Sequence, residues 1–298
     1  MSAAVARIAA LFLLAAGLAA APQASGQELT GTLKKIKDSG SVVIGHRDSS
    51  IPFSYLNAGK RPIGYSIDLC LEIVEQAKEA LGIEELEVIF VPVTAQNRID
   101  MVVAGKIDLE CGSTTSNLAR QKQVAFSPVI FLSGTRLMVK RPVAIRSYLG
   151  LKDKTVVVTA GTTNELAMKE LSDKQKLGIR FMAAQDHAQS FALLEKGRAD
   201  AFATDDVLLY GLIAKSGRAG DFQVVGELLS YDPYGIMYRR DDPAFDAVVR
   251  DAFERLAASR ELEQIYDKWF LARLPTGERL NLPMSAQLRS IFEALGLP

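Results

Sequence analysis

The segment from Cys111 to Arg120 places two hydroxyl groups and a guanidinium where a predicted strand passes into a predicted helix. Ser113 and Thr115 follow a predicted strand that contains the apolar Ile107 and Leu109, and Arg120 lies one turn into the next segment. Free N–H groups at a helix N-terminus, hydroxyl donors and an arginine fork are the groups with which proteins hold a carboxylate. The same residue types also occur as ordinary helix caps beside a surface arginine. This segment alone therefore leaves both interpretations open.

The first 26 residues have the features of a secretory signal peptide. Arg7 is followed by an apolar stretch, 8–21, which is too short to span a bilayer comfortably. Small residues at 24 and 26 form a cleavage site before Gln27. We therefore expect a protein that is exported to the periplasm.

The composition excludes several classes of function. The 298 residues include 35 Lys and Arg against 35 Asp and Glu, so the formal net charge is zero. Nucleic-acid binding, which favours a strongly basic surface, is not expected. The two His and two Cys have no zinc-site spacing, so we expect no metal and no cofactor. Cys70 and Cys111 are either joined by a disulfide, which export permits, or buried separately.

Strands and helices alternate twice along the chain, which predicts an α/β fold with mostly parallel sheets flanked by helices. The first series of predicted elements comprises a strand at 41–45, a helix at 64–81, a strand at 86–91, a helix at 96–104 and a strand at 107–111. The second comprises a strand at 155–159, a helix opening at 161–163, a weak strand at 180–183, a helix at 188–196 and a strand at 199–204. We expect the helix at 64–81 to bury an apolar face made of Ile67, Cys70, Leu71, Val74 and Ala77.

Two repeated series predict two lobes. We expect the first lobe to contain 27–134 and the returning segment 235–298, and the second lobe to contain 135–234. Two strands that cross between the lobes, near 134–139 and 233–237, would form a hinge. Because ligands bind at the carboxyl ends of parallel strands, the polar residues at these ends should face a cleft between the lobes.

Several motifs give the chain a family resemblance that covers 33–270. They are Val43–Tyr55, Gly64–Ser66, Gln96–Ile99, Glu110–Lys122, Phe126–Ser127, Val156–Thr163, Asp186–His187 and Thr204–Asp206. With these motifs the chain resembles the periplasmic solute-binding proteins of amino-acid ATP-binding-cassette transporters. The resemblance implies a type II periplasmic binding fold, a monomer, and delivery of ligand to a permease in the inner membrane.

The resemblance also implies a ligand and a set of ligand-binding residues. The ligand would be L-glutamate or L-aspartate. Arg120, Ser113 and Thr115 would hold its α-carboxylate, and Asp205 its α-ammonium. Arg47 and Arg98 would face the distal carboxylate, while Thr163 and His187 would contribute from the second lobe. Other roles stay open: Asp206 as the ammonium partner or a helix cap, Arg98 as a surface charge, and His187 as a helix-start residue.

Charge counting favours an acidic ligand. Three arginines against one or two aspartates give the predicted site a charge of +2 or +1, whereas glutamate and aspartate carry −1. A neutral amino acid would leave Arg47 and Arg98 without a counter-ion, at a cost of about 3–5 kcal/mol. Glutamine and asparagine should therefore bind poorly.

One position departs from the family pattern. Ala95 stands directly before Gln96–Arg98, where a hydroxyl residue is usual. Its loss could weaken the distal-carboxylate site by about 1–3 kcal/mol, unless Thr94 or water compensates. The preference between glutamate and aspartate therefore stays undecided.

Two other functions are compatible with such a chain. Some proteins of this architecture resemble periplasmic dehydratases such as cyclohexadienyl dehydratase, which need a general acid or base with a tuned pKa. His187 or Asp205 could serve, but an ammonium-binding aspartate and a third arginine would then have no role. A receptor's sensor domain is the other possibility. We expect a binding protein without catalytic residues.

Overall fold

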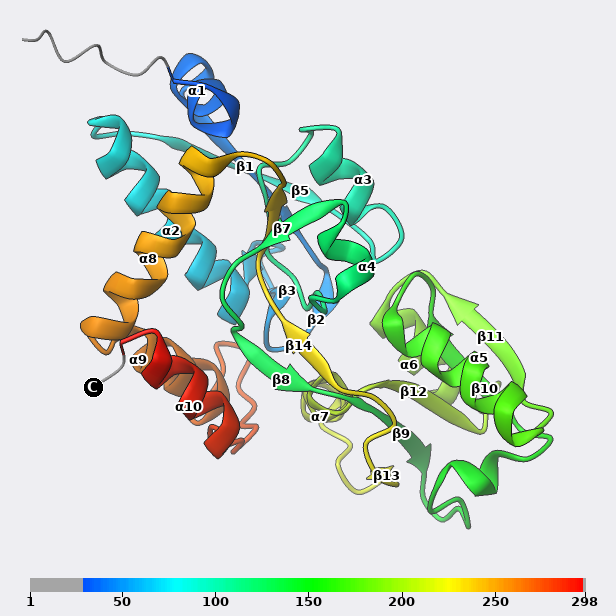
Figure 1. Ribbon diagram of the computed structural model, residues 1–298. Coiled ribbons are helices and arrows are strands. Elements are labelled where there is room, and N and C mark those ends of the chain that lie inside the picture. The colour runs from blue at the N-terminus through cyan, green and yellow to red at the C-terminus, as the bar shows by residue number, and fades with distance from the viewer. Residues whose placement is uncertain (1–28, 297–298) are drawn as a thin grey trace, which may run out of the picture.

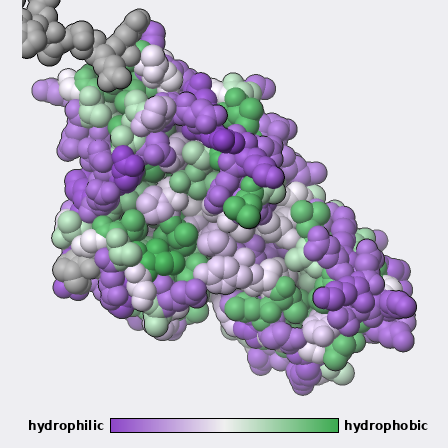
Figure 2. Space-filling view, viewed as in Figure 1, coloured by the Kyte–Doolittle hydropathy of each residue, from purple (hydrophilic) through white to green (hydrophobic). Residues whose placement is uncertain are grey.

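The computed structural model describes residues 29–296, so the predicted signal peptide lies outside the described residues. Two α/β lobes lie end to end and are joined by a pair of crossing strands (Figure 1). The molecular surface narrows between the lobes (Figure 2). None of the helices within 29–296 has both the length and the apolar character to cross a membrane.

The first lobe is built on a mixed five-stranded sheet with the order β5–β1–β6–β15–β7. Its strands are β1 (Ser41–His46), β5 (Glu87–Pro92), β6 (Leu109–Glu110), β7 (Val124–Phe126) and β15 (Met237–Arg239). The strands β5, β1 and β6 run parallel, whereas β15 is antiparallel to both of its neighbours. Strand β15 comes from the returning segment, so the chain completes this sheet only after it has built the second lobe.

Helices surround the first sheet. They are α1 (Gly31–Ser39), α2 (Tyr65–Leu81), α3 (Arg98–Val103), α4 (Leu118–Gln121), α8 (Pro243–Ala258), α9 (Glu261–Phe270) and α10 (Ala286–Ala294). The C-terminal helices α8 to α10 pack on the first lobe (Figure 1). Helix α2 buries Ile67, Cys70, Val74 and Ala77 as predicted, but Leu71 is 37% exposed, so its place on the buried face was predicted wrongly.

The second lobe has its own five-stranded sheet, with the order β11–β10–β12–β9–β13. The strands are β9 (Thr135–Lys140), β10 (Thr155–Thr159), β11 (Arg180–Ala184), β12 (Ala201–Asp205) and β13 (Phe222–Val225). Helices α5 (Thr163–Gln175), α6 (His187–Glu195) and α7 (Asp206–Ser216) pack against it. Val156, Val157 and Val158 of β10 are all fully buried, as expected for a parallel strand covered on both faces.

Three short strands, β2 (Ser49–Ser50), β3 (Ser54–Leu56) and β4 (Pro62–Ile63), form a small sheet in the loop after β1. The 3₁₀ helix η1 (Tyr148–Leu151) precedes β10. The small sheet brings part of the first lobe to the second, because Ser49 Oγ accepts a hydrogen bond from the Ala188 N–H at 3.3 Å.

The crossing strands are β8 (Phe131–Ser133) and β14 (Asp232–Tyr234), which pair antiparallel. The first crossing therefore lies earlier than the predicted segment 134–139, most of which is β9 of the second sheet. A β-carbon on Gly134 would collide with the Ser230 carbonyl oxygen, so only glycine allows the two chains to pass so closely here.

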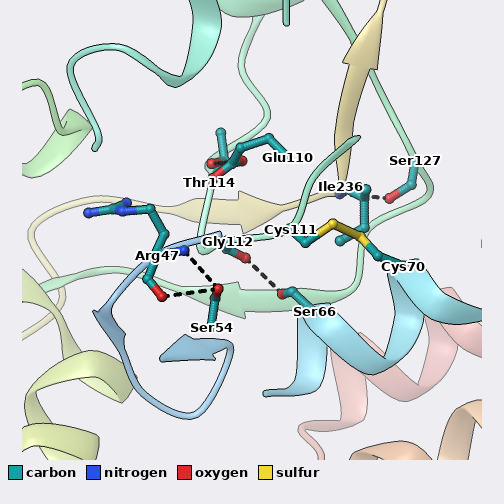
Figure 3. The surroundings of a disulfide bond; sticks show 10 residues. All are labelled: Arg47, Ser54, Ser66, Cys70, Glu110, Cys111, Gly112, Thr114, Ser127 and Ile236. Atoms are coloured by element: carbon teal, nitrogen blue, oxygen red, sulfur yellow. Dashed lines mark hydrogen bonds between the residues drawn. A yellow bond between two sulfur atoms is a disulfide. The ribbon is translucent and has the colours of Figure 1, made fainter. Parts of the chain in front are cut away.

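A disulfide joins Cys70 of α2 to Cys111, with an S–S distance of 2.05 Å and a Cα–Cα distance of 6.3 Å. The question that the sequence left open is thereby answered. One turn earlier on the same helix, Ser66 donates its hydroxyl hydrogen to the Gly112 carbonyl at 2.7 Å (Figure 3). Helix α2 thus holds the chain in two places, directly before Ser113.

Candidate functional site

A small cavity between the two lobes brings most of the predicted site residues together. Seven of the eight predicted residues line it: Arg47, Arg98, Ser113, Thr115, Thr163, His187 and Asp205. Thr162, Asn164 and Leu208 complete the lining. Residues as far apart in the sequence as Arg47 and Asp205 thus meet at the ends of strands and the starts of helices, as expected for parallel sheets.

Two buried arginines form the first lobe's side of this cavity. Arg47 directly follows β1, Arg98 is the first residue of α3, and each is 2% exposed. Burial lowers the pKa of both, and the nearby Arg98 charge helps to lower that of Arg47 to about 10. Both remain cationic at neutral pH. Two buried cations on one wall of a cavity attract an anionic group.

His187 faces the arginines from the second lobe as the first residue of α6. Its Nδ1 lies 2.9 Å from the Thr159 hydroxyl oxygen. Burial, and then the charges of Arg47 and Arg98, hold the His187 pKa well below its usual value. The imidazole is therefore neutral and can donate a single hydrogen bond from the ring nitrogen that carries the proton.

Hydroxyl groups from both lobes meet in the lining of the cavity. The Oγ1 atoms of Thr115 and Thr163 lie 3.2 Å apart, and each hydroxyl donates to Asp232 Oδ1, at 3.0 and 2.9 Å. Ser113 Oγ is buried and has no hydrogen-bond partner among the described residues. Thr115 and Thr163 thus join the lobes through their shared acceptor, Asp232 of the crossing strand β14.

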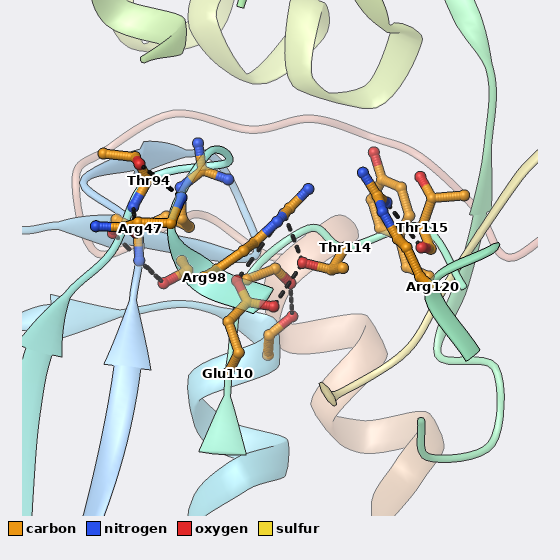
Figure 4. Close-up of polar contacts among 12 residues, drawn as sticks. Arg47, Thr94, Arg98, Glu110, Thr114, Thr115 and Arg120 are labelled. Atoms are coloured by element: carbon orange, nitrogen blue, oxygen red, sulfur yellow. Dashed lines mark hydrogen bonds and ion pairs between the residues drawn. The ribbon is translucent and has the colours of Figure 1, made fainter. Parts of the chain in front are cut away.

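Arg120 is the one predicted residue that does not line the cavity. It lies in the short helix α4, and its Nη1 donates to the Thr115 carbonyl at 2.8 Å. Burial and the Arg98 charge lower its pKa to about 10. In Figure 4, Arg47, Arg98 and Arg120 form a row, with Arg120 beside Thr115.

Asp205 ends β12 and is fully enclosed. Its carboxylate accepts hydrogen bonds from Asn164 Nδ2 at 2.9 Å and from the Tyr234 hydroxyl at 2.5 Å. Burial and the neighbouring Asp232 charge raise the Asp205 pKa to about 7. Asp206, the alternative ammonium partner, does not line the cavity and accepts instead from the Ser133 hydroxyl at 2.7 Å.

Two buried acids were missed by sequence reasoning, Glu110 and Asp232. Glu110 gave a signal, a charge inside an apolar strand, whereas Asp232 lies in a segment that resembles a turn. Together with Asp205 they match the three arginines in number, so the predicted charge of +2 or +1 omitted two acids. An acidic preference must therefore rest on which of these charges reach the cavity: Arg47 and Arg98 line it, whereas Asp205 is the only one of the three acids that does.

Ala95 is buried but does not line the cavity. The hydroxyl of Thr94, which was considered as a substitute, accepts the Asn97 N–H at 3.3 Å. It therefore serves the start of α3, and through that helix the placement of Arg98.

Comparison with known proteins agrees with this geometry. Residues 42–272 match the bacterial extracellular solute-binding proteins, family 3. The chain is 49% identical to an L-glutamate/L-aspartate-binding protein of Pseudomonas aeruginosa, over 94% of this chain and 93% of that protein. It is 43% identical, over the same shares, to a glutamate/aspartate import solute-binding protein of Escherichia coli.

A solved structure bears on the dehydratase alternative. An ancestral amino-acid-binding protein, a precursor of cyclohexadienyl dehydratase, superposes with a TM-score of 0.69. It is 27% identical and covers 80% of this chain and 99% of its own. The similarity to the two glutamate/aspartate-binding proteins is much higher in sequence and extends over more of this chain.

Proposed function

The chain belongs to the bacterial extracellular solute-binding proteins of family 3, and on this premise we propose that it captures L-glutamate or L-aspartate for import by an ATP-binding-cassette transporter. The names of its relatives support binding for transport and not catalysis. We propose further that it works in the periplasm, after removal of residues 1–26, and passes its ligand to a permease as a monomer.

The observation that carries this proposal is the polarity of the cavity. Arg47 and Arg98 bring two buried positive charges to its lining, and Asp205 brings one carboxylate. An acidic amino acid has the complementary pattern, with its distal carboxylate at one end and its ammonium at the other. An amide ligand would bring no negative charge to Arg47 and Arg98, which would then share the single buried charge of Glu110 with Arg120.

The α-carboxylate has its own donors in this proposal. Ser113 Oγ is buried without a partner among the described residues. The Thr115 and Thr163 hydroxyls line the same cavity and would turn their hydrogens from Asp232 to the bound carboxylate. Arg120 supports Thr115 through its carbonyl. These groups would bind the part that all amino acids share, whereas Arg47, Arg98 and His187 would select the acidic side chain.

Closure of the two lobes would couple binding to delivery. We propose that 27–134 with 235–298, and 135–234, move as two bodies about β8 and β14. Thr163, His187 and Asp205 belong to the second lobe and can meet a ligand on the first lobe only when the lobes close. A ligand that contacts both lobes favours the closed form, because it has more interactions there.

Isothermal titration calorimetry with glutamate, aspartate, glutamine and asparagine tests the proposal. We expect both acids to bind more tightly than both amides. Tighter binding of either amide than of both acids would contradict it. Small-angle scattering should also show a smaller radius of gyration when glutamate is added, and an unchanged radius would argue against closure.

A further inference from the structure

Glu110 lies behind the cavity, in the centre of the first-lobe sheet. It is fully buried on β6 and is not among the cavity-lining residues. Its negative charge opposes the fall in pKa that burial causes at Arg47, Arg98 and Arg120. The acid therefore serves as a common counter-ion for the three arginines. Neither the proposed ligand contacts nor the fold itself explains why this position needs a carboxylate.

A relay of hydrogen bonds connects Glu110 to Arg98 (Figure 4). Arg98 Nη1 donates to Thr114 Oγ1 at 2.5 Å, and Thr114 donates its single hydroxyl hydrogen to Glu110 Oε2, also at 2.5 Å. A carboxylate can only accept hydrogen bonds. The hydroxyl hydrogen must therefore point to Glu110, which turns an oxygen lone pair toward Arg98.

Glu110 also acts on Arg98 through its charge. Its Oε1 lies 4.0 Å from Arg98 Nη1 and has no hydrogen-bond partner among the described residues. A carboxylate oxygen at this distance attracts the guanidinium without occupying its other N–H donors. Arg98 lines the cavity, so we expect its remaining Nη donors to reach a ligand, while its buried Nε has no hydrogen-bond partner within 29–296.

The loop after β6 packs closely against Glu110. A β-carbon on Gly112 would collide with Glu110 Oε1 and would lie 3.0 Å from Arg47 Cγ. Ser113 and Thr115 line the cavity, whereas Thr114 between them is fully buried and bonded to the acid. Successive side chains in this extended segment thus point in opposite directions, with Ser113 and Thr115 toward the cavity and Thr114 toward Glu110.

We propose that Glu110 is a positioning residue which, through Thr114, aims the Arg98 guanidinium at the distal carboxylate and so sets the preference for acidic amino acids over their amides. This inference rests on the proposed function of the site. A glutamine at 110 can donate to Thr114 and rotate its hydroxyl hydrogen toward Arg98. A valine at 114 keeps the shape of the side chain but removes the relay.

The test measures, by calorimetry, the ratio of glutamate to glutamine affinity in the wild type and in Glu110→Gln, Thr114→Val and Arg98→Ala. We expect the first two variants to lower this ratio by at least about tenfold, because a hydrogen bond to a charged group usually contributes at least this factor to an affinity. Their glutamine affinity should stay within about threefold of the wild type. The double variant Arg98→Ala/Glu110→Gln should have the ratio of Arg98→Ala alone, because Glu110 acts through Arg98.

Asp108→Asn provides the matched control. Asp108 is also buried and lies two residues before Glu110, but it pairs with Lys35 Nζ at 2.7 Å and accepts the Val43 N–H at 2.9 Å. This variant should leave the ratio unchanged. Circular dichroism and thermal unfolding confirm folding, and if Glu110→Gln does not fold, Thr114→Val carries the test.

An unchanged ratio, an equal loss for both ligands, or an additive effect in the double variant would overturn the positioning role. These outcomes differ from a failure of the proposed function. That failure would be seen in the wild type, as the absence of any preference for acids. A selective wild type whose relay variants remain equally selective refutes only the role of Glu110.

Discussion

The Tyr234 hydroxyl donates to Asp205 Oδ2 at 2.5 Å and thereby joins the crossing strand β14 to the end of β12 in the second lobe. Tyr234 is fully buried and also forms a β-bridge with Thr115 of the first lobe. One side chain therefore connects the proposed ammonium partner, the crossover and the carboxylate-binding loop. We therefore expect substitutions of Asp205 to change both the ligand affinity and the closure of the lobes.

Glutamate affinity should depend on pH through Asp205. Burial and the Asp232 charge raise its pKa to about 7 in the ligand-free protein, and an ammonium ligand favours the ionised form. Binding then releases a proton, so affinity should rise by about tenfold per pH unit from pH 5 to 7 and level off above. Calorimetry in buffers of different ionisation enthalpy measures both the affinity and the released proton.

Asp205→Asn is the control for this dependence. It should bind about 10–100-fold more weakly at pH 8, through the loss of a charge-assisted hydrogen bond, and should show little change between pH 5 and 7. A slope as steep as that of the wild type would assign the titration to another group. In the ligand-free wild type the raised pKa also lowers stability as pH rises from about 4 to 7, because the unfolded chain releases this proton first.

Arg120→Ala should weaken the binding of acidic and amide ligands alike. Arg120 supports Thr115, which we propose to bind the α-carboxylate common to all amino acids, so we expect a loss of at least about tenfold for every ligand. Arg120→Lys keeps the charge but not the planar fork and should restore little of the affinity. Titration of glutamate and glutamine into each variant checks this. A loss confined to the acids would place Arg120 with Arg98 instead.

Removal of the disulfide should lower the stability of the fold and leave the ligand selectivity unchanged. The variant Cys70→Ser/Cys111→Ser frees the chain before Ser113 from α2, but the Ser66–Gly112 hydrogen bond remains. We expect the free energy of unfolding to fall by about 2–4 kcal/mol, measured by urea denaturation. The glutamate-to-glutamine ratio should not change. Dithiothreitol should destabilise the wild type but not the variant, and equal responses would contradict this account.

Gly112→Ala should damage both stability and binding. The added methyl group would collide with Glu110 and crowd Arg47, which cannot move freely because both are buried. Overpacking of this kind typically costs about 1–3 kcal/mol. Thermal unfolding and glutamate titration measure the two effects. Gly220→Ala, where an added β-carbon meets no atom within 4 Å, is the control and should behave as the wild type.

Much of the fold could be predicted from the sequence because its elements depend on local patterns. The predicted strand at 155–159 is β10 with the predicted bounds, and the predicted helix at 64–81 is α2, which begins one residue later. The predicted strand at 107–111 is only Leu109–Glu110 in the structure, although the Asp108 and Cys111 N–H groups on either side still donate to carbonyls of β1. The short strands β2 to β4 gave no clear periodic signal and were not predicted.

Local chemistry also determined most of the candidate site. Arg47, Arg98, Thr163, His187 and Asp205 stand where a strand ends or a helix begins, and the alternation of strands and helices brings such positions to one edge of each sheet. The sequence by itself therefore determined an α/β protein with polar groups gathered at its strand ends. The ligand class came from the residue types found there and from the family resemblance.

Only the tertiary structure decided which thiols, hydroxyls and charged groups interact with one another. The pairing of Cys70 with Cys111, the relay from Arg98 to Glu110, and the meeting of Thr115, Thr163 and Asp232 all join residues that no sequence spacing relates. These contacts depend on how the sheets, crossing strands and helices pack. The physical reason is that a charge or hydroxyl is tuned by its neighbours in space, and folding alone selects those neighbours.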